Sequence, residues 1–95
     1  MTTLLIHHRV ADYDTWKQLY DSVQEMQRSG GVRSHRAWRS TDDPNLVVVE
    51  HVFDSRAAGE AFVNDPALRD AMGRAGVEES SLQFEYLDEV ASGTL

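Results

Sequence analysis

Four histidines lie in stretches of the chain that favour β-strand: His7, His8, His35 and His51. Histidine is the side chain best suited to move protons at neutral pH, because its unperturbed pKa is about 6.5. Successive residues of a strand point to opposite faces of the sheet, so His7 and His8 cannot line the same pocket. We take His35 and His51 as candidate general bases and His7 as a candidate substrate contact. The alternative for His35 is a solvent-exposed histidine on an edge strand.

Glu50 precedes His51, and its role depends on how two predicted strands pair. The strands form a hairpin, and the register of the hairpin decides which residues lie opposite each other. In one register His35 lies opposite Glu50, which would make a base and the carboxylate that orients it. A shift of one residue instead places His35 opposite His51 and Arg36 opposite Glu50. The sequence leaves both registers open, so His35, His51 and Glu50 are all candidate catalytic residues.

No motif in the chain predicts a bound metal or cofactor. His7, His35 and His51, with or without Glu50, could form a metal-binding set. However, no histidine pair has the spacing of a helical or His-x-His site. The chain has no cysteine, which excludes a thiolate nucleophile and a zinc–cysteine site. Gly-rich phosphate loops, serine nucleophile motifs and dinucleotide fingerprints are absent too. We therefore expect no metal and no cofactor.

Three arginines, Arg33, Arg36 and Arg39, concentrate positive charge on one predicted strand of an acidic chain. Guanidinium groups bind carboxylates and phenolates strongly, so this strand could contact an anionic group of a substrate. The alternative is that the charges protect an edge strand from aggregation or form ion pairs between subunits. Arg39, which lies beside the turn that follows, is the arginine that we select as a substrate contact.

Aromatic residues follow the periodicities of helix and strand, and are candidates for stacking on a substrate. Trp16 and Tyr20 belong to an apolar stripe with three- and four-residue spacing, which indicates one face of an amphipathic helix. Tyr86 alternates with its neighbours Leu82 and Phe84 on a predicted strand. We select Trp16, Tyr20 and Tyr86 as candidate substrate contacts. Core packing is the alternative for each of them.

The predicted elements that position these residues follow the order strand, helix, strand, strand, helix, strand. The strands are expected at residues 3–10, 32–40, 46–53 and 82–90. Asp12 favours the start of the first helix as its N-cap, and Gly30–Gly31 favours its end. The second helix is capped by Asp54 or Ser55 and is interrupted at Asn64–Asp65–Pro66.

This order predicts an α+β, ferredoxin-like βαββαβ fold: a four-stranded antiparallel sheet with two helices on one face. At 95 residues the chain is expected to be one domain, residues 1–95. A sheet covered on one face alternates apolar and polar residues, yet Leu4–Leu5–Ile6 and Leu46–Val47–Val48–Val49 are apolar on both faces. We therefore expect the second face to pair with a second copy in a homodimer. The alternative is a monomer with an apolar ligand groove there.

Acidic residues outnumber basic ones 16 to 9, and the net charge is −7. Electrostatic repulsion makes nucleic acid and anionic membrane surfaces poor partners for such a chain. The first residues lack the basic region and the length of a signal peptide, and no apolar stretch is long enough to span a bilayer. We therefore expect a cytoplasmic protein.

Several stretches of the chain are typical of one group of proteins. They are Leu4–Trp16, Ser34–Arg36, Arg39–Asn45, Phe53–Ser55, Leu68–Met72 and Ala75–Val77. On these stretches the chain resembles the dimeric α/β-barrel superfamily, which includes antibiotic-biosynthesis monooxygenases, polyketide cyclases and haem-binding proteins. The resemblance implies a homodimer whose sheets pair into a barrel, with a pocket for a small hydrophobic or aromatic molecule. The Asn-Trp-His arrangement of the haem-degrading members has no match here, so haem is not expected.

The resemblance favours two functions. The first is a cofactor-independent monooxygenase or cyclase acting on an aromatic or polyketide-like substrate, in which His35 or His51 takes a proton. The alternative is a non-catalytic, dimeric ligand-binding or accessory protein. A closed apolar cavity with an inward-pointing histidine would favour the enzyme. Histidines that all face solvent, with the cavity filled by side chains, would contradict it.

Overall fold

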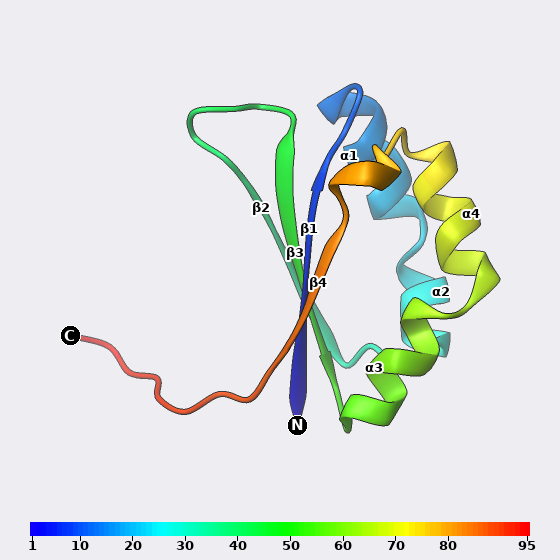
Figure 1. Cartoon of the computed structure of the whole chain (residues 1–95). Coiled ribbons are helices and arrows are strands. Elements are labelled where there is room, and N and C mark those ends of the chain that lie inside the picture. The colour runs from blue at the N-terminus through cyan, green and yellow to red at the C-terminus, as the bar shows by residue number, and fades with distance from the viewer.

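The four strands form one antiparallel sheet, and all the helices pack on one of its faces (Figure 1). This arrangement is seen in a computed structural model that describes residues 1–95. The elements are β1 (Thr2–Arg9), α1 (Tyr13–Ser22), α2 (Gln24–Ser29), β2 (Ser34–Arg39), β3 (Leu46–Phe53), α3 (Arg56–Val63), α4 (Pro66–Arg74), the 3-10 turn η1 (Glu79–Ser81) and β4 (Gln83–Leu87). The strand order β2-β3-β1-β4 confirms the predicted α+β, ferredoxin-like fold. None of the helices combines the length and apolarity that crossing a membrane requires.

Each of the two predicted helices is a pair of shorter helices in the structure. Asp12 caps α1 as predicted, and Ser55, one of the two candidate caps, caps α3; each accepts a hydrogen bond from the backbone N–H three residues further on. Val23 leaves helical geometry, at φ −106° and ψ 18°, and divides the first predicted helix into α1 and α2. Asp65 and Pro66 start α4 as its N-cap and first residue, which confirms the predicted interruption. Four short helices thus cover the twisted sheet.

The sheet has one face buried beneath the helices and one open face. Along β1, Leu4, Ile6 and His8 are buried, whereas Leu5 and His7 are half-buried on the open face. The same alternation along β3 buries every second residue. The largest fully buried side chains are Phe53, Leu4, Ile6, Val10 and Val47, and they form the core between sheet and helices.

The register of the β2–β3 hairpin places His35 opposite His51 and Arg36 opposite Glu50. This is one of the two registers that the sequence left open, and the other, with His35 opposite Glu50, is not formed. The two histidines therefore lie on the helix-covered face, and Arg36 and Glu50 lie on the open face. Because β2 is an edge strand, all six of its residues are exposed, His35 included.

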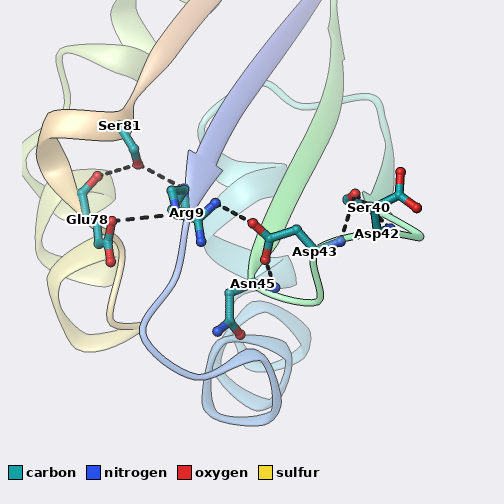
Figure 2. Close-up of polar contacts among 7 residues, drawn as sticks. All are labelled: Arg9, Ser40, Asp42, Asp43, Asn45, Glu78 and Ser81. Atoms are coloured by element: carbon teal, nitrogen blue, oxygen red, sulfur yellow. Dashed lines mark hydrogen bonds and ion pairs between the residues drawn. The ribbon is translucent and has the colours of Figure 1, made fainter.

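A polar cluster around Arg9 joins three segments at the end of β1 (Figure 2). The Arg9 guanidinium forms an ion pair with Asp43 of the β2–β3 turn and a longer one, at 3.9 Å, with Glu78. The Arg9 backbone N–H donates to Ser81 Oγ at 2.8 Å, and the Glu78 N–H donates to the Arg9 carbonyl oxygen at 2.8 Å. The cluster thereby holds Glu78 and Ser81, in the segment after α4, against the end of β1. Val77, which precedes Glu78, lines a cavity between the sheet and the helices.

Candidate functional site

A cavity of about 50 Å³ lies between the sheet and the helices. Of its 15 lining residues 12 are hydrophobic, and none is Asp, Glu, Lys or Arg. The three others, His8, Gln27 and His51, are each less than 5% exposed. A cavity of this size holds a few water molecules, whereas ligand pockets in general enclose about 300–1,000 Å³. A small-molecule ligand therefore requires some lining side chains to move apart.

Helix α1 contributes two stacked aromatic rings, Trp16 and Tyr20, to the lining of the cavity. Their ring centroids are 4.9 Å apart and their planes are 20° from parallel. His8 lies 5.8 Å from the Trp16 ring, and His51 lies 6.5 Å from the Tyr20 ring. We call Trp16 and Tyr20 the aromatic wall, which extends from one histidine to the other. Such a wall suits a flat aromatic ligand, because aromatic rings stack favourably.

His51 is the histidine of the hairpin that lines the cavity. It is 2% exposed, and neither of its ring nitrogens has a hydrogen-bond partner. The rings of Phe62 and Phe53 flank it at 5.3 Å and 6.4 Å. Burial, with a further contribution from nearby His35, lowers the pKa of His51 from 6.5 to about 4. The ring is therefore neutral at pH 7 and has one free donor and one free acceptor for a ligand.

Tyr20 and His35 share a hydrogen bond of 2.9 Å between the phenol oxygen and Nδ1. Burial raises the pKa of Tyr20 to about 12, so the phenol keeps its proton at neutral pH. Tyr20 is buried in the aromatic wall, while His35 is exposed on the edge strand. The pair therefore fixes the Tyr20 ring and connects the cavity wall to a group that solvent reaches.

Glu50 and His7, two further candidate residues, lie on the open face, away from the cavity. Glu50 accepts a hydrogen bond of 3.1 Å from Trp38 Nε1, and His7 Nε2 lies 3.8 Å from a carboxylate oxygen of Glu85. Glu50 therefore does not meet His35, and His7 does not reach the cavity. Glu50 points to the face opposite that of its buried neighbour His51, and His7 to the face opposite that of its buried neighbour His8. The chain also has no group of three or more His, Cys, Asp or Glu placed to hold a metal ion.

Arg39 and Tyr86 face the helices but lie outside the cavity. The Arg39 guanidinium lies 4.2 Å from the ring centroid of Tyr13, the aromatic residue that precedes the aromatic wall on α1. Tyr86 packs close to Gly59 of α3, and the Arg56 guanidinium lies 4.5 Å from its ring centroid. The predicted substrate contacts that do line the cavity are Trp16 and Tyr20.

Sequence reasoning missed two buried polar residues of the cavity, His8 and Gln27. They are 3% and 4% exposed, and His8 Nδ1 and Gln27 Oε1 have no hydrogen-bond partner. Burial lowers the pKa of His8 to about 4, so this ring too is neutral at pH 7. Two signals were present in the sequence. His8 alternates in step with Leu4 and Ile6, and Gln27 follows Tyr20 by seven residues on the apolar stripe.

The fold and the cavity together define a ferredoxin-like domain with a buried, largely apolar pocket. The model of the family described as antibiotic biosynthesis monooxygenase matches residues 11–74, which is more than half of the chain. The chain therefore belongs to the antibiotic biosynthesis monooxygenase family, as its resemblance to the superfamily predicted. No curated protein matches its sequence.

Solved structures of low sequence identity share the fold. A proposed antibiotic biosynthesis monooxygenase from Bordetella bronchiseptica has a TM-score of 0.82 at 9% identity, covering 95% of this chain and 97% of its own. A variant of SnoaB, a cofactor-independent oxygenase from Streptomyces nogalater, has a TM-score of 0.76 at 14% identity, covering 96% and 94%. A proposed family member from Nitrosomonas europaea has a TM-score of 0.72 at 16% identity, covering 96% and 100%.

Proposed function

We propose that the protein is a cofactor-independent monooxygenase that oxidises a small aromatic or polyketide-like molecule in the cavity. The observation that carries the proposal is His51, whose two unpartnered ring nitrogens lie in a largely apolar cavity beside the aromatic wall. Unpartnered buried polar groups are rare and costly, so a cluster of them favours a place where a polar ligand binds. Membership of the family and the fold shared with SnoaB, described as a cofactor-independent oxygenase, support the proposal.

The proposed substrate is a phenol, because its hydroxyl can bond to His51 while its ring stacks on the aromatic wall. His51 accepts the hydroxyl proton, and the resulting phenolate gives electrons to O2. O2 adds to a ring carbon, and His51 returns its proton to the outer oxygen to give a hydroperoxide. That carbon then loses its hydrogen as a proton while the O–O bond breaks, and the proton and the released hydroxide leave as water. A phenol and O2 thus give a quinone and water, with the substrate as the reductant. Tyr20, held by His35, positions the ring.

Oxygen uptake with a panel of phenols tests this proposal. The wild-type protein is expected to consume one O2 per phenol without added flavin, haem or metal. His51→Leu removes both ring nitrogens at similar side-chain volume, and turnover is expected to fall about 100-fold or more, as for loss of a general base. His7→Leu is the matched control, because His7 lies next in the chain but on the open face. Oxygen uptake that is unchanged in His51→Leu would contradict the proposal.

Non-catalytic ligand binding is the second candidate function, and one observation favours it. No carboxylate lines the cavity to orient His51, and the pKa of His51, about 4, makes it a weak base at pH 7. The panel of phenols separates the candidates. Tight binding without oxygen uptake or chemical change of the phenol would favour a binding protein. Chemical change without oxygen uptake would favour a cyclase.

We propose further that the protein is a homodimer formed through the open face of the sheet. Apolar side chains gather there and are only partly covered: Leu5, Val48, Val52, Trp38 and Leu87. Trp38 is 52% and Leu87 40% exposed. Exposed apolar patches favour a protein partner, and a twofold pair of identical copies is the commonest arrangement. Light scattering at micromolar concentration tests the proposal, and a monomeric mass would contradict it.

A cytoplasmic location stays a prediction.

A further inference from the structure

We propose that His8 is a second hydrogen-bonding residue for the ligand, at the opposite end of the cavity from His51. The ligand is then an uncharged molecule with a hydrogen-bonding group at each end. The inference rests on the proposed function, because both concern the same cavity. His8 takes no part in the proton transfer proposed for His51. The class of ligand follows from the spacing of the two histidines and from the absence of charged side chains in the cavity lining.

His8 meets the conditions for a ligand-binding residue in three ways. Its side chain is 3% exposed, its Nδ1 has no hydrogen-bond partner, and it lines the cavity. Its ring lies 5.8 Å from Trp16, the near end of the aromatic wall. A buried imidazole nitrogen without a partner costs free energy unless water or a ligand satisfies it. His8 therefore offers a ligand one unpartnered ring nitrogen, where His51 offers two.

The register of the sheet gives the separation of the two histidines along the strands. On the central pair of strands His51 lies opposite Leu4 and His8 lies opposite Val47, and one buried pair of residues separates them. The four residue steps from Leu4 to His8 on β1 span roughly 13 Å of backbone, and side chains on one face of a sheet stand roughly perpendicular to it. A hydrogen bond of about 3 Å at each end leaves roughly 7 Å between the polar groups of the ligand. Two fused aromatic rings with a hydroxyl at each end have this length.

The lining of the cavity decides the charge of the ligand. No Asp, Glu, Lys or Arg lines the cavity, so an anionic or cationic ligand would lose its hydration without gaining an ion pair. Neutral hydroxyl or carbonyl groups can instead bond to neutral imidazoles. The aromatic wall between the histidines supplies a stacking surface for the rings that join the two groups.

Space for such a ligand exists next to the cavity. A second hollow of about 220 Å³ lies between α4 and the segment that leads into β4, and it shares Met72 and Val77 with the cavity. Arg69 and Glu79 also line this hollow, whereas the space beside the two histidines has no charged side chain. Val77 forms a bridge to Val10, close to His8 in the chain. Methionine side chains are flexible, so rotation of Met72 would join the two spaces at this side. The joined volume approaches that of an ordinary ligand pocket.

Isothermal titration calorimetry with three naphthalenes tests the inference. The first carries hydroxyls at both ends, the second carries one hydroxyl, and the third has a carboxylate in place of one hydroxyl of the first. The wild-type protein is expected to bind the diol about fivefold more tightly than the single-hydroxyl compound, as for one hydrogen bond. It is expected to bind the carboxylate at least about tenfold more weakly than the diol, because neither histidine end of the cavity provides a cation.

Variants at two neighbouring positions separate the effect of His8 from a general effect on folding. His8→Phe is expected to bind the diol and the single-hydroxyl compound equally. His7→Phe, on the open face, is the matched control and is expected to keep the fivefold preference. His8→Gln keeps a polar side chain and is expected to restore part of the preference, so it serves if His8→Phe does not fold. If a folded His8→Phe protein keeps the fivefold preference for the diol, the inference is overturned. If only His8→Gln folds, a complete loss of the preference in that variant overturns it.

The wild-type measurements distinguish failure of this inference from failure of the proposed function. Equal binding of the diol and the single-hydroxyl compound overturns the role of His8, whatever the variants show. If the single-hydroxyl compound binds and His51→Leu weakens that binding, the proposed cavity and His51 stand without His8. If none of the three compounds binds while the panel of phenols still drives oxygen uptake, this inference fails and the proposed function stands.

Discussion

His35 and His51 lie directly opposite each other on β2 and β3, yet His35 is exposed and His51 is 2% exposed. The difference arises from their strands, because β3 lies inside the sheet and β2 lies at its edge. Two residues of one type, paired across one hairpin, therefore have different surroundings. His51 lines the cavity, whereas His35 is joined to the cavity wall through its hydrogen bond to Tyr20.

Replacing His51 by leucine is expected to stabilise the fold while it impairs function. The change removes two buried nitrogens that have no partners, and leucine fills a similar volume. We expect a gain of about 1 kcal/mol in the free energy of unfolding, measured by urea denaturation at pH 7.5. His35→Leu, which removes the bond to Tyr20, is the comparison and is expected to lose about 1 kcal/mol. A less stable His51→Leu protein would show that ordered water satisfies His51 in solution.

The stability of the protein is expected to fall as the pH is lowered from about 6.5 to 4. His8 and His51 each have a pKa of about 4 in the folded chain, against 6.5 when unperturbed. Between these values the unfolded chain binds protons that the folded chain does not, so acid favours unfolding. Each histidine accounts for roughly 3 kcal/mol at pH 4 and for none well above pH 6.5. Urea titrations across this range measure the loss.

The double variant His8→Leu/His51→Leu is the control for the pH dependence. Without the two buried imidazoles, stability is expected to change little between pH 6.5 and pH 5, where most other groups keep their charge. An equally steep loss of stability in the double variant would mean that other groups cause the acid sensitivity.

Aspartate at two adjacent positions of β3 is expected to separate assembly from folding. Val48 points to the open face and Val49, which is 3% exposed, points into the core. Val48→Asp is expected to give a folded monomer, measured by light scattering and circular dichroism. Val49→Asp is expected to unfold the chain, because it buries a charge with no partner at a cost of several kcal/mol. A dimer that survives Val48→Asp would contradict assembly through the open face.

Met72→Ala is expected to speed the entry of ligand into the cavity. Met72 lies between the cavity and the neighbouring hollow, and shortening it would join them. Stopped-flow measurements are expected to show an association rate several times faster. Leu68→Ala is the matched control, because Leu68 also lies on α4 and lines the cavity but not the hollow. Leu68→Ala is expected to cost about 2–4 kcal/mol of stability without faster binding. Equal rates in both variants would place the entrance elsewhere.

The secondary structure was predictable from the sequence because its signals are local. Asp12, Ser55 and Asp65 cap the helices as predicted, since each cap needs only the next two or three backbone N–H groups. The division of the first helix at Val23 was missed, because its apolar stripe continues from α1 into α2 without interruption.

The register of the hairpin was not predictable, because contacts within the turn select it. The N–H of Asp43 donates to Ser40 Oγ at 3.1 Å, and Asp43 Oδ1 accepts from the N–H of Asn45 at 3.0 Å. Arg9 on a third strand holds the same Asp43 in place. These contacts depend on the folded sheet, so the alternation of residue types in β2 and β3 could not choose the face for Glu50.

The candidate site was predictable in part for the same reason. Trp16 and Tyr20 lie on a clear apolar stripe and do line the cavity. The choice between His7 and His8 depended on knowing which residues of the first strand face the helices. The apolar run Leu4–Leu5–Ile6 hid that information, because both faces of this strand are apolar.

The alternation along β1 also has a consequence for how the family can diversify. His7 and His8 are adjacent in the chain, but one faces the surface proposed for assembly and the other faces the proposed ligand. On these two proposals, substitutions at Ile6 and His8 would change the preferred ligand, while those at Leu5 and His7 would change the fit between subunits. Natural variation can explore the two properties separately. An insertion or deletion of one residue within the strand would instead exchange the two sets of side chains and disturb both properties at once.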